Sequence, residues 1–251
     1  MRAALLAWTL LLCASPLAAE PDLSGFWAPV FEQGPADPAM IAKLPDNTVV
    51  IADTGAPEFP RMEFGGLKLK PAALERASTW RAEDEMTLQR VCAPQSIVYS
   101  VQGPFPFAID QTRDVIVLRY EYYDQIRTVF MDGRGHPPPG APHTKMGHSI
   151  GHWEGDELVI DTTHIAASTI TNNGLDHSDA VHMVERYKLS EDGGTLLATQ
   201  WFADPEVLDN NGARFITWTR RPGEYILPYE CDPSFALEYQ ETPQGASPPE
   251  E

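Results

Sequence analysis

The second half of the chain is a series of short strand-like runs separated by turn residues, and this pattern constrains the fold more than any other feature. β-Branched and aromatic residues fill each run, and pairs such as Gly155-Asp156 separate the runs. The pattern covers residues 114–133, 149–165, 182–202 and 214–221. Successive hairpins at this spacing predict an antiparallel meander. A meander of this length most economically closes on itself, because closure removes its unpaired edges.

The first half of the chain carries fewer signals. Residues 23–29 and 49–54 are strand-like, and residues 69–85 predict one helix, with Pro71 suited to its first turn. We therefore predict an all-β, mainly antiparallel fold: a lipocalin-like or calycin β-barrel meander with one helix in its N-terminal half. A mature length of about 230 residues fits a single domain.

The start of the chain predicts a secretory signal peptide. Arg2 supplies a positive charge, residues 3–14 are largely apolar, and small residues precede Glu20. Leu12 is too large for a good lipidation site at Cys13, which favours soluble export over a lipid anchor. We expect residues 1–19 to be the signal peptide, 20–241 to be one β-barrel domain, and 242–251 to be a disordered tail. The mature protein is then periplasmic or secreted.

The charge balance excludes two classes of partner. The formal net charge is −18, and loss of Arg2 with the signal peptide makes the mature chain more acidic. An acidic surface repels phosphate backbones and anionic lipids. We therefore expect no nucleic-acid partner and no membrane insertion after signal cleavage.

Two cysteines, Cys92 and Cys231, remain after signal cleavage. In an exported protein a pair of thiols is more often a disulfide than a metal site. We predict a Cys92–Cys231 disulfide, which joins the middle of the chain to its end and stabilises the fold by about 2–4 kcal/mol. Two unrelated buried thiols are the alternative.

Several motifs resemble those of known proteins. The opening DLSGFW, at residues 22–27, is similar to the Gly-x-Trp opening of lipocalin-like barrels. A larger set resembles a family of exported bacterial proteins that carries no assigned activity. The motifs are CAP (Cys92–Pro94), PFAIDQT (Pro106–Thr112), DGRGHP (Asp132–Pro137), MGHSIGHWEGDELVIDTT (Met146–Thr163) and HSDAVHMVERY (His177–Tyr187). The resemblance implies an exported lipocalin-like barrel and names no reaction.

All seven histidines lie between residues 136 and 182. They are His136, His143, His148, His152, His164, His177 and His182. Histidine titrates near neutral pH and is the commonest proton carrier and metal ligand, so the clustering indicates a site. Zinc sites need three or four converging ligands, and the sequence has no HExxH or CxxC motif. We expect an acid/base site without metal or cofactor, with metal binding as the main alternative.

The hairpin around Gly155-Asp156 predicts two catalytic residues. A two-residue turn there places Ile150 opposite Asp161, with His148 two residues further along the same strand. Because side chains alternate across a strand, His148 and Asp161 share a face as diagonal neighbours within side-chain reach. A carboxylate beside an imidazole fixes its tautomer and raises its basicity. We predict a His148–Asp161 dyad, with a solvent-side pair that merely stabilises the hairpin as the alternative.

The next hairpin predicts a third catalytic candidate, Glu185. It lies opposite Gln200, and its face is shared with Tyr187 and apolar residues, so it points inward. A buried carboxyl is either paired or has a raised pKa, and such groups concentrate at functional sites. A structural ion pair with Arg127 is an equally weighted alternative.

Four side chains are candidates for binding the substrate: Arg127, Arg134, His182 and Tyr187. Arg134 lies in the turn-rich loop DGRGHPPPG at residues 132–140, where prolines restrict the backbone. A guanidinium in this position can hold an anionic or carbonyl oxygen of a ligand. Alternatively, Arg134 pairs with Asp132 and braces the loop.

These features predict an exported barrel enzyme that performs cofactor-free acid/base chemistry on a small, largely apolar or aromatic molecule. Hydratase, dehydratase, isomerase or lyase chemistry fits, since the sequence shows no dinucleotide or phosphate loop. We expect the barrel cavity to use His148, Asp161 and Glu185 for proton transfer. Three alternatives remain: a non-catalytic periplasmic carrier of a small hydrophobic ligand, a metal-binding envelope protein, and a structural or assembly component of the envelope.

Overall fold

The computed structural model describes residues 20–52 and 59–237. The predicted signal peptide at residues 1–19 and the predicted tail at 242–251 lie outside the described residues. So do the last two positions of the predicted strand at 49–54.

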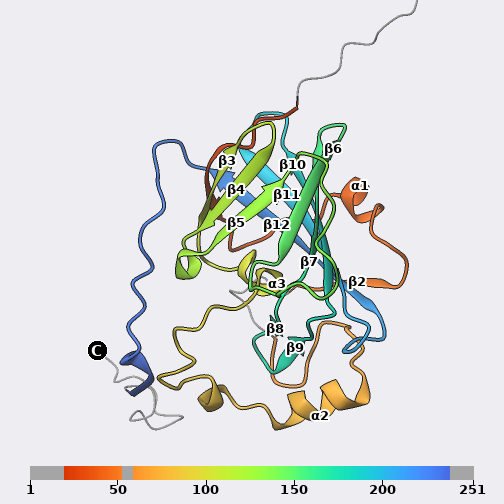
Figure 1. Cartoon of the computed structure of the whole chain (residues 1–251), viewed down its shortest axis with the longest axis vertical. Coiled ribbons are helices and arrows are strands. Elements are labelled where there is room, and N and C mark those ends of the chain that lie inside the picture. Colours follow the sequence, from red (N-terminus) through yellow and green to blue (C-terminus); the bar gives the residue numbers. More distant parts are fainter. Residues whose placement is uncertain (1–19, 53–58, 238–251) are drawn as a thin grey trace, which may run out of the picture.

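Nine strands of the described chain form a closed barrel (Figure 1). In sheet order they are β1 (Gly25–Pro29), β3 (Phe107–Gln111), β4 (Val115–Tyr120), β5 (Ile126–Phe130), β6 (His148–Glu154), β7 (Glu157–Thr163), β10 (His182–Leu189), β11 (Thr195–Ala203) and β12 (Asn211–Arg220). The barrel closes because β1 pairs with both β3 and β12, so that Trp27 lies between Phe107 and Arg220. The predicted all-β barrel is confirmed.

The pairing is antiparallel around the barrel except between β5 and β6, which run parallel. The long connection from residue 131 to 147 returns the chain to the end of the barrel where β5 began. A parallel pair requires such a crossover, whereas a tight turn produces an antiparallel pair. A tenth strand, β2 (Thr48–Val50), forms hydrogen-bonded pairs with β12 and also runs parallel to it.

Short elements lie outside the barrel. They are α1 (Pro38–Ile41), α2 (Pro71–Thr79), α3 (Ile97–Ser100), the 3₁₀ turns η1 (Ala82–Asp84) and η2 (Tyr122–Asp124), and a hairpin of β8 (Ser168–Thr171) and β9 (Leu175–His177). The helix predicted at 69–85 is present as α2 followed by η1. In Figure 1 the hairpin and α2 lie below the barrel.

Helix α3 closes the lower end of the barrel (Figure 1). Arg214 on β12 donates from Nη1 to the carbonyl of Val98 at 3.0 Å, and Gln200 on β11 donates to the carbonyl of Ile97 at 3.2 Å. Ile97 and Val98 are fully buried in the core. Side chains and this helix therefore fill the space that an open-mouthed barrel leaves for a ligand.

A disulfide joins Cys92 to Cys231, as predicted, with the two Cα atoms 5.8 Å apart. It ties the C-terminal segment, drawn in blue at the left of Figure 1, to the segment that precedes α3. Within the described ranges, none of the helices combines the length and apolar character needed to cross a bilayer.

Candidate functional site

Two polar networks lie on opposite faces of β6, β7 and β10, because successive side chains of a strand point to opposite faces of the sheet. The predicted registers are confirmed: Ile150 pairs with Asp161, and Glu185 pairs with Gln200. However, Glu185 also pairs with Ile160 across β7, so it shares a barrel face with Ile160 and not with Asp161. The single cavity predicted for His148, Asp161 and Glu185 is therefore wrong. Glu185 points into the barrel, whereas His148 and Asp161 lie on its outer face.

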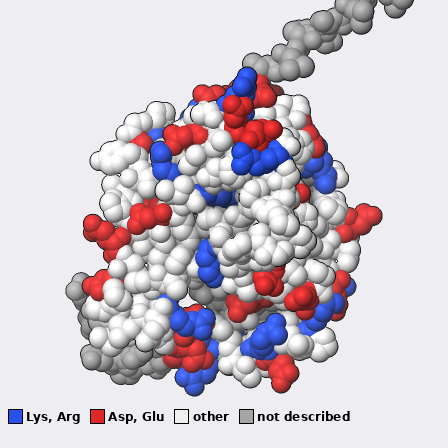
Figure 2. All heavy atoms as spheres, in the orientation of Figure 1, with Lys and Arg blue, Asp and Glu red and all other residues white. Residues whose placement is uncertain are grey.

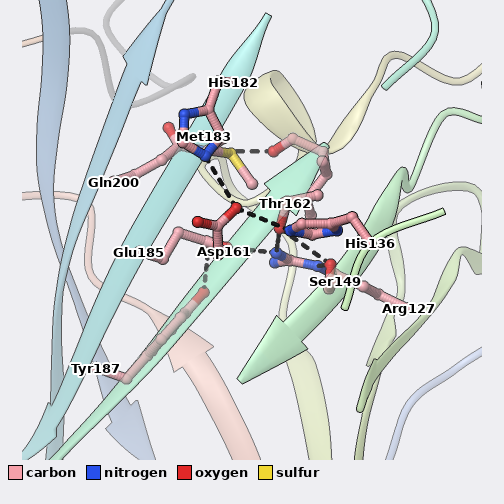
Figure 3. Close-up of polar contacts among 11 residues, drawn as sticks. Arg127, His136, Ser149, Asp161, Thr162, His182, Met183, Glu185, Tyr187 and Gln200 are labelled. Carbon is pink, nitrogen blue, oxygen red and sulfur yellow. Dashed lines mark hydrogen bonds and ion pairs between the residues drawn. The ribbon is translucent and has the colours of Figure 1, made fainter. Parts of the chain in front are cut away.

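The inner network centres on an ion pair between Arg127 and Glu185. Arg127 Nη2 lies 2.6 Å from Glu185 Oε2, and both side chains are only 1% exposed. Arg127 also donates to Ser149 Oγ at 2.9 Å and to Thr162 Oγ1 at 2.6 Å, while Tyr187 donates to Glu185 Oε1 at 2.8 Å (Figure 3). The buried ion pair that we considered as the alternative is what forms.

Electrostatics keep Arg127 and Tyr187 each in one protonation state. Burial works to lower the pKa of Arg127, but the Glu185 carboxylate and two nearby tyrosines outweigh burial and hold that pKa above its usual value. Burial, reinforced by Glu185, raises the pKa of Tyr187 well above its usual value. Arg127 therefore stays charged and Tyr187 stays neutral at ordinary pH. Because solvent hardly reaches these side chains, we assign the network to stability.

The outer network centres on Asp161, which holds two imidazoles through one oxygen. Asp161 Oδ1 accepts from His136 Nε2 at 3.0 Å and from His182 Nε2 at 2.9 Å (Figure 3). Asp161 is 37% exposed and His182 is 42% exposed, so both are accessible from solvent. We refer to His136, His148, Asp161 and His182 as the outer cluster.

His148 joins the outer cluster through His136, whose Nδ1 lies 3.1 Å from His148 Nδ1. The direct His148–Asp161 contact predicted from the register does not form, because His136, on the loop between β5 and β6, lies between the two side chains. Sequence reasoning counted His136 among the clustered histidines and gave it no role. Its place in DGRGHP, a loop motif, carries no periodicity that could position it.

The tautomers of the outer cluster follow from Asp161. A carboxylate only accepts hydrogen bonds, so Nε2 of His136 carries a proton, and a neutral His136 then has a bare Nδ1. The short contact to His148 consequently requires a proton on His148 Nδ1. The lone pair of His148 is left on Nε2, as a proton acceptor.

The environment shifts the pKa values of the two terminal histidines in opposite directions. Burial lowers the pKa of His148, and the neighbouring His136, His164 and Arg134 lower it further. The hydrogen bond to Asp161 raises the pKa of His182 in spite of partial burial. Partial burial works to raise the pKa of Asp161, but the hydrogen bonds from His182 and His136 hold it below its usual value.

Aromatic rings flank both ends of the outer cluster. Phe130 stacks on His148 with ring centroids 5.3 Å apart, and Trp201 meets His182 edge-on at 5.7 Å. The Arg134 guanidinium lies 3.9 Å from the centroid of Phe130. Arg134 also pairs with Asp132 at 2.6 Å, the loop-bracing contact that we considered, and it remains half-exposed.

Another pair has the geometry of a nucleophile and its base. Ser96 Oγ lies 2.7 Å from His177 Nε2, and His177 Nδ1 lies 2.8 Å from the carbonyl of Ser178. Burial lowers the pKa of His177 to about 4, so this imidazole is neutral. Ser96 and His177 are 0% and 2% exposed, so both side chains are buried. Their contact holds α3 to β9.

The remaining observations bear on ligands and relatives. In the part of the chain that the structure describes, no group of three or more His, Cys, Asp or Glu side chains is arranged to hold a metal ion. The members of the outer cluster follow one another in a row, since His136 uses opposite sides of its ring for Asp161 and His148. No protein-family model matches the chain, and a search of curated proteins finds no match. Function is therefore inferred from the site itself.

Proposed function

We propose that the chain is an exported barrel enzyme whose outer cluster performs cofactor-free acid/base chemistry on a small, largely apolar or aromatic molecule. The observation that carries this proposal is that the pKa values of two accessible histidines, both linked to Asp161, are shifted in opposite directions. The pKa of His148 is lowered and that of His182 is raised. Two titratable groups whose environments separate their pKa values are the usual signature of a base and an acid.

His148 is the general base of this proposal. Its Nε2 carries the lone pair, and its lowered pKa keeps the imidazole neutral at pH 7. His136 and Asp161 orient it, as the third group of a catalytic triad orients the base. A fixed, neutral imidazole accepts a proton without first losing one.

His182 is the general acid. Its raised pKa favours the protonated form near neutral pH, and its Nδ1–H is the proton to be donated, because Nε2–H is engaged by Asp161. His148 is on β6 and His182 on β10, with β7 between them, so their strands lie roughly 10 Å apart. A small molecule can span this distance along the outer face.

Phe130, Trp201 and Arg134 supply the binding surface in this proposal. The two rings offer apolar contact beside the base and the acid. Arg134 offers a half-exposed guanidinium to a carbonyl or anionic oxygen. Proton removal at one end and donation at the other fits hydratase, dehydratase, isomerase or lyase chemistry. Resemblance of the sequence motifs to exported proteins supports the export part of the proposal, as does the Cys92–Cys231 bond.

The test uses 5-nitrobenzisoxazole, a small aromatic molecule that opens when a base removes one proton from carbon. His148 Nε2 takes that proton, the ring N–O bond breaks, its electron pair leaves on the phenolate oxygen, and the protonated His182 donates a hydrogen bond to that oxygen. We expect the wild-type protein to accelerate this reaction and His148→Ala to lower the rate by about tenfold or more.

The matched control is His152→Ala, on the same strand and outer face but paired with Glu154. It should keep the wild-type rate. Equal rates for the two variants would remove His148 from the proposal. Binding of the probe by the wild-type protein without acceleration would support the carrier alternative instead.

A further inference from the structure

A hollow of about 400 Å³ lies on the surface away from the outer cluster. Its walls are the segment from residue 85 to 95, the η2 turn, and the β8–β9 hairpin. Figure 2 shows this face hollowed between the lobe at lower left and the main body, with positive and negative side chains at the margin. The volume is in the range of small-molecule sites.

Two opposite charges face this hollow without pairing. Lys145 Nζ donates to the carbonyl of Ala167 at 3.1 Å, and neither Lys145 nor Asp176 forms an ion pair with another described side chain. They attract each other across the hollow. The other charged pair of the lining, Glu85 and Arg90, is joined at 2.8 Å, and the charge of Arg90 also acts on Asp176.

The protonation behaviour of both groups agrees with a sheltered position. Burial lowers the pKa of Lys145. Burial also raises the pKa of Asp176, against the hydrogen bond from Thr169 and the nearby cations. Asp176 remains exposed to solvent all the same. Solvent reaches this carboxyl although protein atoms surround it, and this combination indicates that the group lies in a concavity.

The third component is an aromatic wall made by Tyr99, Tyr122 and Tyr123. Tyr123 donates to the carbonyl of Val91 at 2.6 Å, and Tyr122 donates to Gln95 Oε1, so both rings are held in place. Tyr123 has a φ of 54°, in the left-handed region that is strained for a non-glycine residue. The fold sustains this strain at a turn whose rings line the hollow.

We propose that this hollow binds a small zwitterion with an aromatic body, and a free aromatic amino acid is the simplest such molecule. Its carboxylate contacts Lys145, its ammonium contacts Asp176, and its ring packs against the tyrosines. A simple anion would meet the carboxylate of Asp176, and a purely apolar ligand would leave both charges without an ion-pair partner. One unpaired cation and one unpaired anion match a ligand that carries both charges.

This site is independent of the proposed catalytic function, because binding is measured without turnover. The experiment is isothermal titration of the full mature chain with L-phenylalanine, N-acetyl-L-phenylalanine and L-phenylalaninamide. The acetyl analogue lacks the ammonium and the amide lacks the carboxylate. We expect L-phenylalanine to bind, and each analogue to bind about tenfold or more weakly, the ratio that one lost charge contact gives.

Two variants assign each end of the ligand. Lys145→Met should make L-phenylalanine bind as weakly as L-phenylalaninamide, and Asp176→Asn should make it bind as weakly as the acetyl analogue. Lys188→Met, at a lysine outside the hollow, is the matched control and should bind as the wild type does.

Some results would overturn the proposal: no binding of L-phenylalanine at millimolar concentration, or equal binding of the three compounds by the wild-type protein. The comparison of the three compounds on the wild-type chain decides the matter even where a variant fails to fold.

Discussion

His136 and His148 face each other through their Nδ1 atoms, 3.1 Å apart, so a single proton lies between the two rings. Asp161 decides which ring carries it, because its carboxylate requires the proton of a neutral His136 to be on Nε2. A loop residue to which the proposal gives no contact with the substrate thereby sets the tautomer of the base. This arrangement leads to a direct spectroscopic prediction.

In the wild-type protein we expect His148 to carry its proton on Nδ1. Replacing His136 by phenylalanine removes the acceptor, so His148 should lose its preference for that tautomer. Long-range proton–nitrogen NMR spectra of the two proteins report the tautomer of each imidazole. His143→Phe is the control, since the ring of His143 lies against His164 in a tilted contact and is not part of the outer cluster. An unchanged His148 spectrum in His136→Phe would show that the relay is absent.

The opposite pKa shifts predict a bell-shaped pH dependence of kcat/KM for 5-nitrobenzisoxazole. The base must be neutral, so activity rises with pH through the pKa of His148, which lies below 6.5. The acid must be protonated, so activity falls with pH through the pKa of His182, which lies above 6.5. His182→Ala should lower the maximum and remove the descending limb. A descending limb that persists in this variant would place the acid elsewhere.

The inner ion pair predicts strong coupling between two variants. Arg127→Met leaves Glu185 buried without its partner, and Glu185→Leu leaves Arg127 in the same position. Each single change should lower the free energy of unfolding by about 3–5 kcal/mol. The double variant should lose much less than the sum, because no unpaired charge remains. Urea unfolding of the four proteins completes the cycle, and additive losses would contradict a paired role.

His177 predicts a loss of stability in mild acid. Its folded pKa of about 4 lies below the ordinary 6.5, so between these values the unfolded chain binds a proton that the folded protein does not. The free energy of unfolding should fall by about 3 kcal/mol as pH drops from 6.5 to 4. Chemical unfolding across this range should show a smaller slope in His177→Gln. His152→Gln, at an exposed histidine, should retain the wild-type slope.

The hairpins could be predicted because local chemistry sets them. Gly155 adopts a φ of 66°, which glycine tolerates, so the β6–β7 turn and the register of Ile150 with Asp161 could be predicted from the amino-acid sequence. The parallel pairing of β5 with β6 could not be predicted, because no turn signal joins them. Strand β3 (Phe107–Gln111) was also missed. It is short, and its partners β1 and β4 include one strand that is distant in sequence.

The candidate site shows the same division. Alternation correctly placed His148 with Asp161, and Glu185 with Tyr187, on common faces. It did not show that these two faces point in opposite directions, one into the barrel and one to its outside. That relationship depends on the register between β7 and β10. His136 enters from a loop whose path is set by long-range packing. Sequence patterns describe strands well and describe such loops poorly.

The pairing of Trp27 with Arg220 has a consequence for the time course of folding. Because the first strand of the barrel, β1, pairs with the last, β12, the sheet cannot close until nearly the whole chain has been synthesised. Pairings this distant in sequence are slow, and β-barrels with many of them fold in roughly milliseconds to seconds. A newly made chain therefore stays open for an interval that the position of β12 determines, and an open chain is the form that the export we propose requires.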